Sequence, residues 1–112
     1  MNSQPELFEP DMKRTEIERV LLYALGEFQA RKKVLAEREL ALDRLRGAFK
    51  RAAEKFGAPQ PSDEQIAESL EKLGAKVIKV PSFVAKHPFR VTVSGDLAFK
   101  AAEFYKLTLE ND

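Results

Sequence analysis

Large apolar residues recur every seven positions along the first half of the chain. Six residues form this apolar repeat: Leu21, Phe28, Leu35, Leu42, Phe49 and Phe56. A seven-residue apolar repeat keeps one seam of a helix against a partner helix. Because no proline lies between Asp11 and Ala58, the pattern predicts one amphipathic, coiled-coil-like helix over residues 11–57, about 68 Å long at about 1.5 Å per residue. We predict that the apolar repeat is the interface with a second copy or another protein.

Both ends of the predicted helix carry sequence signals. The helix can begin at Asp11, which follows a proline, or at the capping box Thr15–Glu18. The segment Gly57–Pro61 ends it, because glycine and proline terminate helices. Residues 1–10 are polar and contain proline, which predicts a flexible N-terminal segment.

Residues 58–112 have the pattern of a small α-β-β-α head. The capping box Ser62–Gln65 begins a short helix, which Gly74 ends. Residues 76–80 are rich in β-branched side chains, and residues 89–93 alternate apolar with polar ones. These patterns predict two strands, which we expect to pair as an antiparallel hairpin.

Asp96 is expected to cap a last helix. The predicted fold is therefore α+β and helix-dominated, with a long N-terminal helix and a small head packed on it. A head of this size buries little apolar surface by itself. Leu22, Tyr23 and Leu25 lie off the apolar repeat, and we expect them to pack against the C-terminal helix or a second chain.

The composition excludes several kinds of site. The chain has 112 residues, of which 44% are hydrophobic and 33% charged, typical of a folded protein. It has no cysteine and a single histidine, His87, so we predict no disulfide, no metal site and no cofactor. No apolar run approaches the roughly 18 residues that a membrane span needs. We therefore expect a soluble, cytoplasmic protein.

The net charge of +1 conceals two basic blocks, residues 31–55 with a net charge of +5 and residues 76–100 with +4. These blocks are the electrostatic indication of an anionic partner. The candidate nucleic-acid contacts are Arg44, Arg51, Lys55, Lys79, Lys86, His87 and Arg90. Acidic residues are interleaved with the bases of the first block, which is also typical of a solvated, salt-bridged helix.

The order of elements in the head resembles the second half of a winged helix-turn-helix domain. On that resemblance the helix over residues 63–73 would recognise DNA, and the hairpin would contact phosphates. The preceding helix of that fold is missing unless the end of the long helix supplies it. The candidate recognition helix is also acidic, with Lys72 as its only base against four carboxylates, Asp63, Glu64, Glu68 and Glu71. This charge disfavours binding to phosphates.

The sequence contains no glycine-rich phosphate loop, serine elbow or metal-spaced carboxylate cluster. We therefore predict that the chain is not an enzyme. The first hypothesis is a non-catalytic interaction protein, such as an adaptor, assembly or regulatory subunit, that oligomerises through its long helix, with a dimer as the simplest case. The alternative is a nucleic-acid-binding protein that uses the basic hairpin and helix residues.

Overall fold

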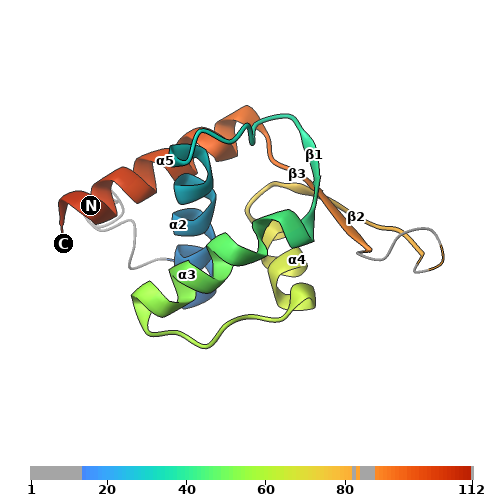
Figure 1. The fold of residues 1–112 in the computed structure, drawn as a ribbon, viewed down its shortest axis with the longest axis horizontal. Helices are drawn as coiled ribbons and strands as arrows, with labels where there is room; N and C mark the ends of the chain where they lie inside the picture. Colours follow the sequence, from blue (N-terminus) through green and yellow to red (C-terminus); the bar gives the residue numbers. More distant parts are fainter. Residues whose placement is uncertain (1–13, 82, 84–87, 112) are drawn as a thin grey trace, which may run out of the picture.

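The first helix begins at the second of the two predicted starts. The computed structural model describes residues 14–81, 83 and 88–111 (Figure 1). Helix α2 (Glu16–Ala30) begins at a capping box in which the Thr15 hydroxyl accepts a hydrogen bond from the Glu18 N–H and the Glu18 carboxylate accepts one from the Thr15 N–H. Asp11, the other predicted start, lies outside the described residues.

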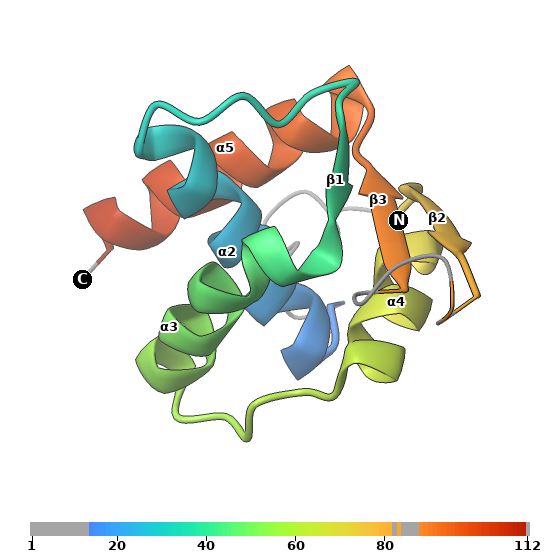
Figure 2. The same cartoon turned by 45° about the vertical axis from the view of Figure 1, so that its right-hand side comes forward.

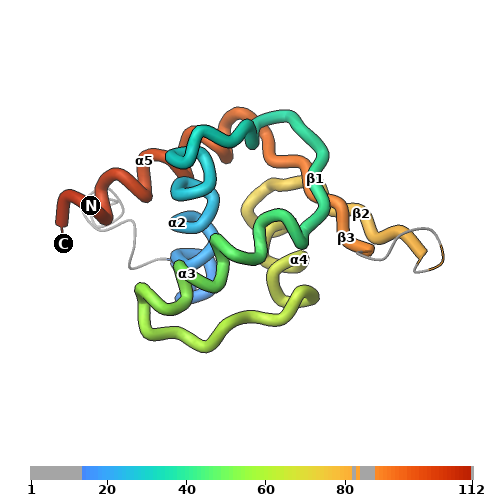
Figure 3. The backbone as a smooth tube through the Cα atoms, viewed as in Figure 1, coloured from blue at the N-terminus to red at the C-terminus, as the bar shows by residue number. Residues whose placement is uncertain are grey.

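The prediction of one continuous helix over residues 11–57 is wrong. α2 ends at Ala30, and a connection leads to strand β1 (Glu39–Ala41), the 3₁₀ turn η2 (Leu42–Leu45) and helix α3 (Arg46–Phe56). Lys32 and Glu37, in the connection, have left-handed φ angles of 67° and 60°. Figure 3 shows the connection running beside the start of α5 (Gly95–Glu110), where the Gly95 N–H donates a hydrogen bond to the Glu37 carboxylate (2.8 Å).

Burial explains why the helix breaks. Two left-handed non-glycine residues cost about 2–4 kcal/mol together. The break carries Leu35, Leu40 and Leu42 into the core, where each is at most 4% exposed. Burying three leucines contributes about 4–9 kcal/mol, which exceeds the backbone cost. A straight helix would leave the same side chains in water unless a partner covered them.

The apolar repeat is therefore not a coiled-coil seam. Its first two members lie on α2, its last two on α3, and the middle pair in the connection and in η2. Five of the six are buried within the single chain, and Phe56 is half-buried and makes a T-shaped contact with the Tyr23 ring, at 5.5 Å between centroids. The structure therefore gives no support to an interface through these six residues. Oligomerisation stays a prediction, but one that no longer rests on the apolar repeat.

The hairpin prediction is confirmed, and β1 joins it. Strands β2 (Lys76–Lys79) and β3 (Phe89–Thr92) pair antiparallel, and β1 pairs with the other edge of β3, giving the strand order β1-β3-β2 (Figure 2). Leu40 and Val77 both lie opposite Val91, on the face of the sheet that packs on the core.

The short helix of the head forms where the sequence predicts it. Helix α4 (Asp63–Lys72) begins at the Ser62–Gln65 capping box and is followed by Gly74, whose φ of 105° is readily available only to glycine.

The residue that caps the last helix is Ser94 rather than Asp96. The Ser94 hydroxyl accepts a hydrogen bond from the Leu97 N–H, and Asp96 lies in the first turn of α5. α5 crosses α2 closely, and the ring centroids of Tyr23 and Tyr105 are 4.9 Å apart. The expected contact between α2 and the C-terminal helix is confirmed. Over the described residues, no helix combines the length and the apolar character that crossing a membrane requires.

Candidate interaction surface

The core and one polar contact fix the orientation of α4. Ile66 and Leu70 are at most 2% exposed and hold its inner face against the core. Its first residue is tied to α3, because the Arg46 guanidinium donates a hydrogen bond to the Asp63 carboxylate (2.6 Å). This pair also compensates the charge of Asp63. The outer face of the helix is thereby held toward solvent.

Three carboxylates line that outer face. Glu64, Glu68 and Glu71, which we call the acidic stripe, are exposed and follow one another at spacings of four and three residues. Residues at these spacings lie on one side of a helix. Lys72 is the single base on α4. The acidic stripe therefore presents three negative charges on the outer face of α4, with the exposed Lys72 beside Glu68 at a spacing of four residues.

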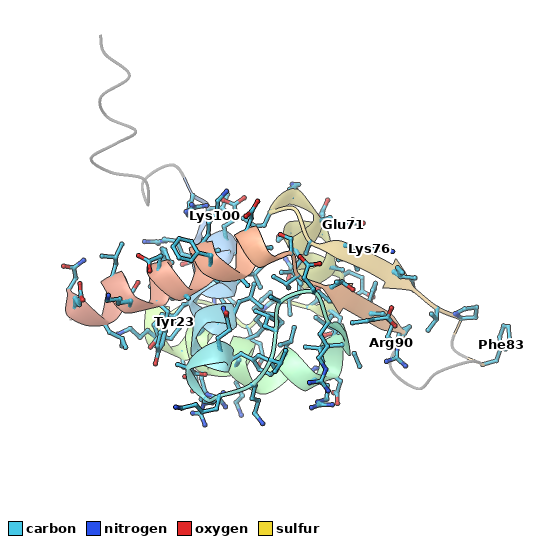
Figure 4. All side chains as sticks on the ribbon, turned by 90° about the horizontal axis from the view of Figure 1, so that it is seen from above. Tyr23, Glu71, Lys76, Phe83, Arg90 and Lys100 are labelled. Carbon is cyan, nitrogen blue, oxygen red and sulfur yellow. The ribbon has the colours of Figure 1, made fainter. Side chains whose placement is uncertain are left out.

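The hairpin carries the opposite charge. Lys76 and Lys79 are exposed on β2, Arg90 is half-exposed on β3, and neither strand contains a carboxylate (Figure 4). The Lys79 ammonium lies 5.4 Å from the centroid of the Phe89 ring, which favours a cation–π contact. Lys86 and His87, two of the predicted contacts, lie outside the described residues.

Apolar side chains accompany these bases on the hairpin. Phe83, which lies along the chain between β2 and β3, is 89% exposed (Figure 4). Ile78 on β2 is 39% exposed. A shallow pocket at the same end is lined by Lys79, Val80, Pro81 and Pro88. Exposed aromatic and aliphatic groups beside charges are typical of protein interfaces.

Two of the predicted bases of the first half, Arg51 and Lys55, do not join the hairpin. Arg51 lies on α3 and forms a salt bridge with Glu27 (2.7 Å), and the Lys55 ammonium lies 5.8 Å from the centroid of the Tyr23 ring. Arg44, by contrast, is exposed on η2, which contacts β3. α3 packs against α2, whereas the hairpin projects from the other side of the fold (Figures 1 and 2). The predicted nucleic-acid contacts therefore do not form one positive surface among the described residues.

A small pocket of about 140 Å³ lies between the start of α2 and the connection from α3 to α4. Its walls are mostly apolar, with Ile17, Val20, Pro59 and Pro61, and its polar groups come from Glu16, Gln60 and Gln65. None of these is a nucleophile paired with a base. Among the residues described, no three His, Cys, Asp or Glu side chains gather closely enough to hold a metal ion.

Sequence reasoning missed the strand β1 and the separate helix α3. The only local signal for β1 is the alternation of Leu40 and Leu42 with Glu39 and Ala41, and four residues are too few to override a longer helical pattern. With α3 in place, a helix precedes α4, as the winged-helix resemblance requires.

Comparison with known proteins finds no counterpart for this arrangement. No protein-family model matches the chain, no curated protein is similar to it, and no solved structure matches its fold.

Proposed function

We propose that this chain is a non-catalytic interaction protein with winged-helix topology, and that it binds another protein through α4 and the hairpin. Two observations support the topology. The order of elements from α2 to β3 is helix, strand, helix, helix, strand, strand, and the sheet has the order β1-β3-β2. In a winged helix-turn-helix domain this order places α4 in the recognition position and the hairpin in the position of the wing.

The acidic stripe carries the proposal. Nucleic-acid affinity comes mainly from neutralising phosphates with Lys and Arg, and α4 instead presents three exposed carboxylates at the recognition position. Phosphates would be repelled there, whereas a protein surface rich in Lys or Arg would be attracted. The exposed Phe83 and Ile78 supply apolar area on the hairpin, with Phe83 at the end that points away from Glu71 (Figure 4).

The experiment compares two double variants with equal charge change. Glu68→Gln with Glu71→Gln removes two members of the acidic stripe, and Glu39→Gln with Glu54→Gln removes two exposed carboxylates elsewhere. Glu64 is kept because a carboxylate in the first turn favours the helix dipole. Immobilised wild type and both variants are exposed to the same cell extract, and quantitative mass spectrometry identifies the retained proteins.

We expect proteins with basic surfaces to be retained by the wild type and the control variant and lost with the α4 variant. Equal retention by all three chains would contradict a role for the acidic stripe.

Nucleic-acid binding through the hairpin alone is the second candidate. Lys76, Lys79 and Arg90 lie on two paired strands that lack carboxylates, which favours contact with phosphates. The test is fluorescence anisotropy with labelled duplex DNA, single-stranded DNA and structured RNA over a salt series. Binding that weakens steeply with salt, and that the triple alanine variant of these residues abolishes, would replace the first candidate. No binding at about 50 mM salt would remove the second.

A further inference from the structure

The outer edge of β2 is open. The strand order β1-β3-β2 places β2 at the end of the sheet, and no described helix or strand runs along its outer side in Figures 2 and 4. An edge strand presents backbone N–H and C=O groups that can pair with an added strand. The outer edge of β2 is therefore a candidate site for strand addition.

The register shows which backbone groups face that edge. The Val80 N–H donates a hydrogen bond to the Pro88 C=O (2.8 Å), and hydrogen-bonded pairs alternate with non-hydrogen-bonded pairs along antiparallel strands. Ile78 therefore directs its N–H and C=O toward β3, whereas Val77 and Lys79 direct theirs to the outer side. Among the described residues, neither Val77 nor Lys79 forms a backbone hydrogen bond outside the sheet.

Both ends of the edge are limited. Pro81 takes the next outward position and has no N–H, so pairing ends there. At the other end, the Ala75 N–H already donates a hydrogen bond to the Leu70 C=O (2.9 Å). A shallow pocket lies at the Pro81 end, lined by Lys79, Val80, Pro81 and Pro88. The edge therefore fits a short strand, with a place for one apolar side chain beside its end.

The side chains along this edge are basic. Lys76 and Lys79 are exposed on β2, and Arg90 is half-exposed on β3, opposite Ile78. Residues 72–95 contain no Asp or Glu, although 18 of the 112 residues of the chain are acidic. The ion pairs among the described residues all use arginines outside the hairpin. The charge of the hairpin therefore favours an acidic partner.

A second copy of this chain does not fit the edge. Two copies joined along β2 would bring the lysines of both strands together, and lysine on an edge strand opposes such pairing. We propose that the outer edge of β2 binds an extended acidic segment of a partner protein, which adds to the three-stranded sheet as a further strand. This inference rests on the proposed function and names the chemistry that the hairpin recognises.

The spacing of the lysines defines the segment. In an antiparallel pairing, acidic residues opposite Lys79 and Lys76 are separated by two residues, which lie opposite Ile78 and Val77. Ile78 is 39% exposed and Val77 is half-buried, so apolar residues fit there. The expected order is acid, apolar, apolar, acid, since opposite charges and β-branched side chains that face each other across two strands stabilise the pair.

Fluorescence anisotropy of two labelled peptides with the full chain tests the proposal. The first peptide, Leu-Thr-Glu-Val-Val-Glu-Thr, has the expected order and a leucine for the pocket. The second, Leu-Thr-Glu-Pro-Pro-Glu-Thr, carries the same charges, but its prolines remove backbone N–H groups and disfavour pairing. Because the contact is small, we expect the first to bind with a Kd of roughly 10–100 μM. The second should bind about tenfold more weakly or worse.

Two variants of Lys79 separate the backbone from the charge. Lys79→Ala keeps the outward N–H and should weaken binding of the first peptide about two- to fivefold. Lys79→Pro also removes that N–H, which makes no hydrogen bond to β3, and should weaken binding about tenfold or more. Both variants lose the contact with the Phe89 ring equally. Circular dichroism checks their folding, and the two peptides decide the question if Lys79→Pro does not fold.

No binding of the first peptide at about 1 mM, equal binding of the two peptides, or equal binding by folded Lys79→Ala and Lys79→Pro would overturn the proposal. Equal binding of the peptides would mean that the hairpin recognises negative charge alone, as in the second candidate function. The variant with Glu68→Gln and Glu71→Gln keeps the β2 edge, so it should still bind the first peptide while losing the basic proteins of the extract. The two experiments therefore fail separately.

Discussion

Gly26 is the position where the packing of α5 on α2 can be tested most directly. It is buried in the middle of α2, and a Cβ added there would overlap the Tyr105 Cβ and lie 2.5 Å from the Ala101 carbonyl oxygen. One neighbour is backbone and the other is the root of a side chain, so neither can rotate away. Normal contact between heavy atoms requires about 3.5 Å, so Gly26→Ala must push α5 outward by about 1 Å.

The expected change in the free energy of unfolding is the difference between two opposing effects. Overpacking of this kind costs about 1–3 kcal/mol and occasionally more, and here it disturbs the interface between α2 and α5. Replacing a helical glycine by alanine returns up to about 1 kcal/mol. We therefore expect Gly26→Ala to lower the free energy of unfolding by about 1–2 kcal/mol, measured by urea denaturation.

Gly47 provides the matched control. It is exposed in the first turn of α3, and its added Cβ would meet only the end of the flexible Arg51 side chain, at 3.4 Å. Gly47→Ala should therefore raise the free energy of unfolding by roughly 0.5 kcal/mol. A Gly26→Ala variant as stable as the wild type, or stabilised like Gly47→Ala, would refute the close approach of α5 to α2.

Four further variants test other parts of the fold. Leu35→Asp and Leu42→Asp each bury an unpaired carboxylate at a position that is 2% exposed. Each should therefore lower the free energy of unfolding by about 4 kcal/mol or more and reduce the helical circular-dichroism signal. A variant that stays folded but has a lower mass in solution would instead support the predicted oligomer interface. Ser62→Ala removes the cap of α4 and should cost about 1 kcal/mol in urea denaturation, and an unchanged midpoint would show that the cap is dispensable. The triple alanine variant of Lys76, Lys79 and Arg90 should leave the thermal melting curve nearly unchanged, because these side chains are exposed or half-exposed. A collapsed melting curve would show that they support the fold.

For the acidic stripe and the hairpin, the sequence locates the charged residues, and the structure decides which of them lie on one surface. The chain itself indicates that residues 63–73 are acidic and that the hairpin is basic. The contact of α4 with the start of α3, through Arg46 and Asp63, involves a helix that the sequence pattern did not separate from α2.

Sequence alone determined the elements whose signals are local. The capping boxes at Thr15 and Ser62, the left-handed Gly74 and the two-residue alternation over residues 89–93 each involve neighbours within a few positions. These contacts form whichever way the rest of the chain folds, so α4, β2 and β3 lie close to where the pattern placed them.

Only the tertiary structure decided the path of residues 31–45. A seven-residue apolar repeat has the same appearance whether its residues share one helix seam or meet in a core after the chain turns. The turn passes through Lys32 and Glu37, which are neither glycine nor proline, so no local residue type predicts it. Its backbone cost is offset by burying leucines against α2 and the sheet, contacts that exist only once distant parts of the chain have come together.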